Sequence, residues 1–486
     1  IESLKYKILQ QFGFAPTQEQ GQALDTFVSF LTDRDPQAVM ILRGSAGTGK
    51  TSLSGAIVRT LLQIRQKVML LAPTGRAAKV FSLGSGAPAY TIHRRIYREK
   101  AFAGVDGQFS LNDNLYTDTL FMVDEASMIA NMGLGGTTFG SGCLLDDLVK
   151  FVYQGHNDRL LLIGDKAQLP PVGEEESPAL SASVMEGYGL KVYECDLNEV
   201  LRQSQSSGIL YNATLIRQMI THDAVTGLPL IRFKGFADIV MMPGAELVES
   251  LGDSYHHVGM DETMVITRSN KRANIYNNGI RNMVLDREEE LSSGDMLMIV
   301  KNNYFWTEKE KKESGEGSAG AVPAFLANGD RAKVLRVSNY IELYGFRFAT
   351  LLLQLPDYDD YEMQVTGMLD TLQSEAPALT HEQQEELFRQ VEEDYQHFVP
   401  LKADRMKSIR QDAYFNALQI KYAYAVTCHK AQGGQWAHVY VDQGYMTDDM
   451  LTPDYIHWLY TAFTRATDKL FLVNWPKEQT CEPTDL

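Results

Sequence analysis

The chain has 486 residues, with 44% hydrophobic and 22% charged side chains, the balance of a soluble globular protein of roughly two to four domains. A formal net charge of −17 argues against a protein that coats nucleic acid by bulk electrostatics, but it still allows a narrow groove lined by local lysines and aromatic rings. The chain has no apolar run near the roughly 18 residues of a membrane span, a start (IESLKYKILQQF) too polar for a signal peptide, and four scattered cysteines; we therefore expect a cytoplasmic protein with no membrane partner.

The first motif in chain order is a phosphate-binding pattern. Residues 39–42, VMIL, indicate a buried strand, and SLSGAIVRTLLQI carries apolar residues at helical spacing. Between them, GSAGTGKT matches G-x-x-x-x-G-K-[ST] in the strand-to-helix context that this pattern requires. Its glycines let backbone N–H groups approach an anion, Lys50 can reach the β- and γ-phosphates, and the Thr51 hydroxyl can ligate Mg²⁺. The segment predicts a site for a nucleoside triphosphate.

A pair of carboxylates follows a second apolar strand. TLFMV leads directly into Asp124 and Glu125, and carboxylates at the C-terminal edge of a parallel strand point into the crevice where ligands bind. We expect Asp124 to hold Mg²⁺, directly or through water, and Glu125 to activate the attacking water as a general base. Together with the phosphate motif, the pair predicts hydrolysis of the nucleotide.

Three further side chains are candidates for contact with the γ-phosphate. RLLLIGDKAQLPPVG is a strand followed by a proline-stiffened turn, in which Gln168 could hydrogen-bond the γ-phosphate. Arg202, in LNEVLRQS, and Arg465, in YTAFTRATDKLFLV, carry the planar guanidinium that suits a transferring phosphoryl group. Because Arg465 lies far along the chain, its participation would place the nucleotide between two domains that close on binding and open after hydrolysis.

The order of strands and helices predicts two α/β domains with parallel sheets, the second interrupted by an insertion. We assign residues 1–205 to the first domain, residues 206–292 and 420–486 to the second, and residues 293–419 to the insertion. In the insertion, SGDMLMIVKNNYFW and LANGDRAKVLRVSN are typical of antiparallel strands, TEKEKKESGEGSAGA of a mobile charged loop, and THEQQEELFRQVEEDYQHF and RMKSIRQDAYFNALQIKY of helices. NMGLGGTTFGSG, in the first domain, is also expected to be a mobile loop.

Taken in order, these motifs resemble those of the superfamily 1 helicases. GSAGTGKT, LAPTGRAAKV, TIHRRIY, VDEASM, GDKAQLPPVG, LRQS, YAYAVTCHKAQGGQW and YTAFTRA are similar in kind and order to the motifs of the subclass that holds the RecD-like, Dda-like and Pif-type DNA helicases. The resemblance covers both α/β domains and most of the chain. It implies two RecA-like motor domains, with a small Src-homology-3-like barrel and a helical part in the insertion.

The resemblance also implies roles for individual residues. TQEQGQAL is similar to the family's glutamine motif, with Gln20 as the adenine reader. The implied nucleotide site comprises Gln20, Gly44, Ser45, Ala46, Gly47, Thr48, Gly49, Lys50, Thr51 and Gly434; Lys50, Glu125, Gln168, Arg202 and Arg465 act in hydrolysis, and Thr51 and Asp124 hold Mg²⁺. Single-stranded DNA would lie along Pro73, Thr74, Thr91, His93, Thr427, His429 and Lys430, since hydroxyls, a lysine and backbone N–H groups hold phosphates without reading sequence. His93, His429, Tyr97 or Trp436 could stack on bases, and residues 98–114 fall where the family places a wedge, with Phe102 or Phe109 at the fork.

The activity implied is that of an ATP-dependent DNA helicase that moves 5′→3′ on single-stranded DNA; the polarity comes from the resemblance alone. Its partners would be single-stranded DNA, forked or tailed duplex, and proteins of DNA repair or recombination, and we expect a monomer that uses ATP and Mg²⁺. Two alternatives stay open: a helicase subunit of a larger recombination or nuclease complex, and a DNA-stimulated ATPase that translocates without unwinding. A P-loop ATPase with no role on nucleic acid would leave the motifs of the second domain unexplained.

Overall fold

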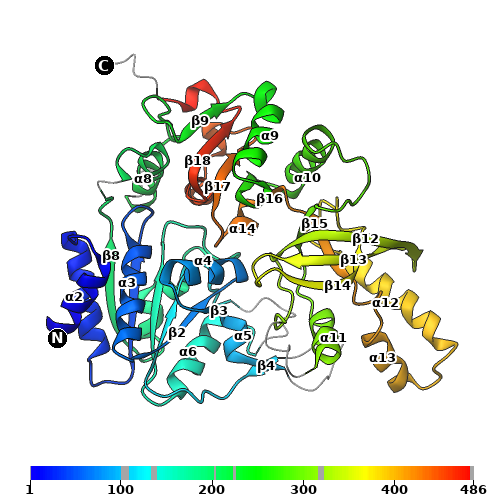
Figure 1. Ribbon diagram of the computed structural model, residues 1–486, viewed down its shortest axis with the longest axis horizontal. Helices are drawn as coiled ribbons and strands as arrows, with labels where there is room; N and C mark the ends of the chain where they lie inside the picture. Colours follow the sequence, from blue (N-terminus) through cyan, green and yellow to red (C-terminus); the bar gives the residue numbers. More distant parts are fainter. Residues whose placement is uncertain are drawn as a thin grey trace.

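The computed structural model describes residues 2–99, 109–132, 140–201, 204–222, 226–315 and 322–481 (Figure 1). It contains two parallel sheets, each in its own α/β domain, and a closed β-barrel. Figure 1 shows the first domain at lower left, the second above it and the barrel at the right. The fold class expected from the sequence, two RecA-like domains with a β-rich and helical insertion in the second, is confirmed.

The first domain is built on a six-stranded sheet whose strands are all parallel. The strand order is β3 (Ala89–Thr91), β2 (Lys67–Ala72), β6 (Thr119–Val123), β7 (Arg159–Gly164), β1 (Ala38–Gly44) and β8 (Lys191–Leu197). Successive side chains of a strand point to opposite faces, so Val39 and Ile41 enter one core and Met40 and Leu42 the other. The helices are α1 (Glu2–Phe12), α2 (Gln18–Leu31), α3 (Lys50–Gln63), α4 (Gly75–Ser85), α5 (Ile92–Ile96), α6 (Leu144–Gln154) and α7 (Ala182–Glu186).

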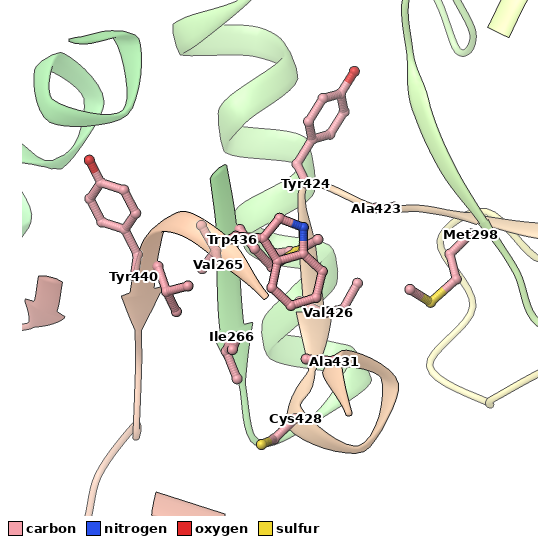
Figure 2. Packing of buried hydrophobic residues seen from close by; sticks show 14 of the residues in the cluster. Val265, Ile266, Met298, Ala423, Tyr424, Val426, Cys428, Ala431, Trp436 and Tyr440 are labelled. Atoms are coloured by element: carbon pink, nitrogen blue, oxygen red, sulfur yellow. The ribbon is translucent and has the colours of Figure 1, made fainter. Parts of the chain in front are cut away.

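The second domain has a five-stranded sheet, also parallel throughout. The strand order is β16 (Ala425–Thr427), β10 (Thr263–Thr267), β17 (Trp436–Val441), β18 (Ala466–Val473) and β9 (Ile239–Met242). The helices are α8 (Gly208–Thr221), α9 (Leu247–His257), α10 (Asn270–Gly279), α14 (Cys428–Ala431) and α15 (Pro453–Phe463). Figure 2 shows part of the core, where Val426 of β16 and the Trp436 ring lie beside Val265 and Ile266 of β10.

Five strands of the insertion close the barrel: β11 (Met296–Ile299), β12 (Arg331–Leu343), β13 (Phe346–Leu355), β14 (Tyr361–Met368) and β15 (Leu418–Tyr422). Neighbouring strands are antiparallel, except that β14 and β15 are parallel. The helices α12 (His381–Gln396) and α13 (Lys402–Arg410) lie between β14 and β15 in the chain and extend away from the barrel in Figure 1. The strand β15 crosses the boundary expected at residue 419. It also makes the helix expected over RMKSIRQDAYFNALQIKY wrong at its end, because LQIKY is buried throughout as a strand of the barrel.

The charged loop expected at TEKEKKESGEGSAGA is wrong in its first half. Residues 307–314 complete the helix α11 (Phe305–Ser314), and residues 316–321 lie outside the described residues. The helix is anchored at its start, because the Trp306 indole is 4% exposed and its N–H donates to the Asn416 carbonyl at 2.8 Å. Burial of this first turn outweighs the polar composition that suggested a loop.

A short antiparallel pair lies where the wedge is expected. The strands β4 (Tyr97–Glu99) and β5 (Phe109–Leu111) pair, while residues 100–108, including Phe102, lie outside the described residues. The Phe109 ring packs 4.8 Å from the ring of Tyr304, next to the start of α11. Most of the loop expected at NMGLGGTTFGSG, residues 133–139, also lies outside the described residues. Within the described part of the chain, no helix has the length and apolar character to cross a membrane.

Candidate nucleotide and nucleic-acid sites

The connection between β1 and α3 forms a P-loop at the start of a helix. Gly47 and Gly49 have φ angles of 77° and 80°, the left-handed region that favours glycine, and α3 begins with no side-chain cap. The Ser45 hydroxyl, in a side chain that is 6% exposed, has no hydrogen-bond partner among the described residues. An uncapped helix N-terminus and an unpaired hydroxyl fit a polyphosphate.

The P-loop lines a cavity of about 450 Å³ between the two α/β domains. The first domain contributes Lys50, Thr51, Asp124, Glu125 and Gln168, and the second contributes Gly433, Gln435 and Arg465. The structure thus brings together the candidate residues for hydrolysis that it describes, although Arg465 follows Lys50 by hundreds of residues. Arg202 lies outside the described residues, between Leu201 and Ser204, which line the same cavity.

The two carboxylates after β6 have different surroundings. Asp124 accepts a hydrogen bond from the Glu125 N–H at 2.8 Å, and Glu125 has a φ of 53°, a left-handed conformation that costs a non-glycine residue on the order of 1 kcal/mol. Burial, followed by the Glu125 charge, raises the pKa of Asp124 to about 6, against the opposing charge of Lys50. A divalent cation at this carboxylate would favour its ionised form, and with the Thr51 hydroxyl the oxygen donors fit Mg²⁺.

Arg465 is held in place by acceptors from both domains. Its side chain is 3% exposed; Nε donates to the Thr461 carbonyl at 3.1 Å, Nη1 to the Gly434 carbonyl at 2.8 Å and Nη2 to Gln168 Oε1 at 3.1 Å. Gln168 in turn donates through Nε2 to Thr464 Oγ1 at 3.0 Å. Gln168 and Arg465, both predicted to contact the γ-phosphate, are therefore hydrogen-bonded directly to each other across the domain boundary.

Two other predicted nucleotide residues lie behind the cavity wall. Gln20 is 1% exposed; its Oε1 accepts from the Thr17 N–H at 3.0 Å in a capping box of α2, and its Nε2 donates to the Thr48 carbonyl at 3.1 Å. Gly434 is next to the lining residue Gly433 and supplies the carbonyl that Arg465 uses. Adenine reading by Gln20 stays a prediction; in the structure both residues support the P-loop or the arginine.

The sequence did not single out Tyr460, which also connects the two domains. The Ala46 N–H donates to its hydroxyl at 3.2 Å, and that hydroxyl donates to Asp165 Oδ2 at 2.5 Å. On the same helix, Thr461 Oγ1 accepts from the Leu169 N–H at 2.8 Å. Both residues lie in YTAFTRA, so the motif indicated that this segment is functional. The sequence could not show which of its side chains contact the first domain.

A second, smaller hollow gathers the predicted DNA residues of the first domain. Its volume is about 110 Å³, and it is lined by Pro73, Thr74, Thr91 and His93 together with residues from the connections between the barrel strands, namely Asn302, Phe325, Asn328 and Tyr358. Thr74 and Thr91 are the N-cap residues of α4 and α5. Burial lowers the pKa of His93 to about 4, so its ring is neutral near pH 7 and would contact DNA by stacking or as a neutral hydrogen-bonding group.

The predicted DNA residues of the second domain lie around α14. Thr427 is its N-cap residue, His429 is exposed and Lys430 is half-buried. Burial lowers the pKa of Lys430 to about 8, and its Nζ donates to Asn328 Oδ1 at the rim of the hollow. The lysine thus joins the two groups of predicted contacts. Thr427 and His429 do not line the hollow.

Two of the four rings considered for base stacking are inaccessible. Tyr97 is 6% exposed and its hydroxyl donates to Asp147 at 2.6 Å, and Trp436 is 2% exposed in the core of the second domain. A base could not stack on either ring in this structure, because neighbouring side chains already cover it. The expectation is therefore wrong for Tyr97 and Trp436, and His93 and His429 stay candidates.

Comparison with known proteins gives two family matches in the motor domains. Residues 16–227 match the model of the AAA domain family, and residues 422–473 match the UvrD-like helicase C-terminal domain, so the two segments together cover more than half of the chain. They contain the P-loop with its carboxylates and the segment from α14 to Arg465.

Relatives agree with these matches. The chain is 30% identical to the ATP-dependent RecD2 DNA helicase of Deinococcus radiodurans over 157 residues, which is 32% of this chain and 18% of that protein. It is 25% identical to the ATP-dependent DNA helicase dda of Enterobacteria phage T4, over 53% of this chain and 55% of that protein. The match thus spans a small part of RecD2 and about half of Dda.

A crystal structure of Pif1 helicase from Bacteroides with ADP-AlF3 and single-stranded DNA aligns over 96% of this chain and 95% of that one, with a TM-score of 0.44 and 13% identity.

The family assignment rests on the matched segments and on the motifs that the structure places in them. The motifs of both segments meet at one cavity, with Lys50 and Glu125 on one side and Arg465 on the other. The chain belongs to the superfamily 1 helicases, in the subclass of the RecD-like, Dda-like and Pif-type proteins.

Proposed function

We propose that this chain is an ATP-dependent DNA helicase that moves along single-stranded DNA and unwinds the duplex ahead of it, in the 5′→3′ direction. The observation that carries the proposal is the cavity between the domains, because it joins the P-loop and carboxylates of one domain to the arginine of the other. A nucleotide held there would favour closure of the two domains, and its hydrolysis would release them.

The residues of the cavity have separate tasks in this proposal. Lys50 and the P-loop N–H groups bind the β- and γ-phosphates. Thr51 and Asp124 would hold Mg²⁺, which would neutralise charge at the phosphates. Glu125 orients the attacking water and accepts its proton, and Arg465 stabilises charge that develops on the transferred group. Gln168 keeps the guanidinium in position through its hydrogen bond.

The nucleotide cavity and the DNA hollow approach each other closely, which supports a link between the nucleotide and the DNA. Gly433 lines the nucleotide cavity, and a Cβ on this glycine would lie 3.2 Å from Thr74 Oγ1, a predicted DNA contact. Gln432 donates to the Leu169 carbonyl at 2.7 Å, next to Gln168. A movement of α14 along a DNA strand would therefore change contacts at both the nucleotide cavity and the DNA hollow, as a motor requires.

The test is ATP turnover with and without single-stranded oligonucleotide, measured beside unwinding of duplexes with a 5′ or a 3′ tail. We expect strong stimulation of turnover and unwinding from the 5′ tail only. Stimulation without unwinding would favour a translocase or a motor that needs protein partners. Turnover that single-stranded DNA does not change would refute the proposal, and unwinding from the 3′ tail would refute the polarity.

A further inference from the structure

The hydroxyl of Tyr460 lies at the point where the second domain touches the P-loop. Its helix, α15, belongs to the second domain, whereas both of its hydrogen-bond partners, the Ala46 N–H and the Asp165 carboxylate, belong to the first. The side chain is 1% exposed, and burial followed by the Asp165 charge raises its pKa well above the usual value, so the hydroxyl keeps its proton. Ala46 lines the nucleotide cavity.

The hydroxyl begins a continuous chain of hydrogen bonds that ends at the arginine. Asp165 Oδ2 accepts from Tyr460 at 2.5 Å and from Gln168 Nε2 at 3.4 Å, and Gln168 Oε1 accepts from Arg465 Nη2 at 3.1 Å. The same carboxylate accepts the Ala167 N–H through Oδ1 at 3.0 Å, which fixes its orientation. The amide of Gln168 is thereby orientated by partners on both sides of the domain boundary.

From this geometry, and resting on the proposed ATP hydrolysis, we propose that Tyr460 is a positioning residue. Its hydroxyl joins the second domain to the P-loop and, through Asp165, holds Gln168 and Arg465 in the arrangement that hydrolysis needs. The residue does not line the cavity and so contributes nothing to binding by direct contact. Loss of the hydroxyl should lower turnover without weakening nucleotide binding, because binding contacts are intact and the arrangement of the catalytic groups is not.

The experiment compares Tyr460→Phe with Tyr455→Phe. Tyr455 lies on the same helix, is 3% exposed and donates its hydroxyl proton to Gln443 within the second domain, so it controls for loss of a buried hydroxyl. For Tyr460→Phe we expect kcat with saturating single-stranded DNA to fall about tenfold or more, the rate equivalent of one hydrogen bond to a charged group, with KM for ATP and the Kd of a fluorescent ATP analogue unchanged. Tyr455→Phe should match the wild type.

Two further variants show whether Tyr460 acts through the proposed chain of contacts. Asp165→Asn leaves the tyrosine ring in place but replaces the carboxylate that accepts its hydrogen bond by a neutral amide, and should cause the same selective fall in kcat. In the double variant Tyr460→Phe/Gln168→Ala, turnover should be no lower than in Gln168→Ala alone, because both changes break one pathway.

Several results would overturn this inference. Wild-type turnover in Tyr460→Phe would do so, and so would a parallel loss of nucleotide affinity and thermal stability, which a merely structural role predicts. If Tyr460→Phe does not fold, unchanged turnover in Asp165→Asn overturns the inference instead. Failure here differs from failure of the proposed function, since the latter is seen in the wild-type chain as turnover that DNA does not stimulate.

Discussion

Replacement of Arg465 by alanine removes the guanidinium that joins the two domains at the nucleotide cavity. Beyond its bonds to the Thr461 and Gly434 carbonyls and to Gln168, Nη2 also lies 3.3 Å from Thr464 Oγ1. These contacts use four of the five N–H groups that a guanidinium carries, so among the described residues one N–H of Nη1 is left to face a phosphate.

The number of N–H groups left for the phosphate sets the expected fall in turnover. A guanidinium supplied to a transferring phosphoryl group is worth about 10³–10⁵ in rate. Since one N–H and the charge remain for the phosphate, we expect the lower end for Arg465→Ala, a fall of about 10³-fold in DNA-stimulated kcat, equivalent to about 4 kcal/mol. Arg465→Lys keeps the charge but has no planar fork, and should recover only a small part of the loss.

The assay is phosphate release at saturating ATP and oligothymidine, with equilibrium binding of a fluorescent ATP analogue measured on the same samples. Lys469→Ala is the matched control, because Lys469 is an exposed basic residue on β18, the strand that begins directly after Arg465, and it does not line the cavity. Affinity for the analogue should stay near the wild-type value if the arginine acts in the transition state. Wild-type turnover in Arg465→Ala would show that the cavity between the domains is not the site of hydrolysis.

Four other outcomes are expected. Lys50→Ala should abolish phosphate release, whereas Glu125→Gln should still bind the ATP analogue and release phosphate at least about 10²-fold more slowly, as expected on loss of a general base. In Gly434→Ala the new Cβ would lie 2.5 Å from the indole ring two residues on; we expect a loss of about 1–3 kcal/mol in a thermal melt and slower turnover, while Gly252→Ala, with open space around its Cβ, should show neither. Because burial lowers the pKa of Lys430 to about 8, raising the pH from 7 to 9 discharges it, so affinity for single-stranded DNA by fluorescence anisotropy should fall over this range; a fall of the same size in Lys430→Met would contradict the assignment.

The chemistry of the nucleotide site could be predicted from the sequence because its parts are local. Lys50 and Thr51 are fixed by the single turn between β1 and α3, and Asp124 and Glu125 by the end of β6, which is separated from β1 in the sheet by β7 alone. The contacts of Tyr460 could not be predicted in this way, since the partner Ala46 lies 414 residues away along the chain. Such a pairing depends on how two domains meet, which no spacing within a motif encodes.

Strands at sheet edges and one helix were also missed, for identifiable reasons. β8 has the sequence KVYECDL and lies at the edge of its sheet, where half-exposed positions admit polar residues, so it lacked the apolar run by which the central strands were found. β9 has only four residues and also lies at an edge. The polar composition of α11 suggested a loop, but the buried side chains of Trp306 and Thr307 anchor its first turn.

The segment that connects the barrel to the second domain is very short. Only Ala423 and Tyr424 separate β15 of the barrel from β16 of the sheet, and Figure 2 shows this segment packed between the two. The Tyr424 carbonyl accepts from the Val265 N–H of the sheet at 3.1 Å, while its hydroxyl donates to Asp295 beside the barrel at 2.6 Å. Because this segment is hydrogen-bonded both to the sheet and beside the barrel, a movement of the second domain should be passed on to the barrel. The first domain also contacts the barrel, because Lys79 Nζ donates to the Pro356 carbonyl between β13 and β14 at 2.6 Å. If ATP binding closes the two domains as proposed, distances from a dye on the barrel to each domain would show which of these contacts is kept.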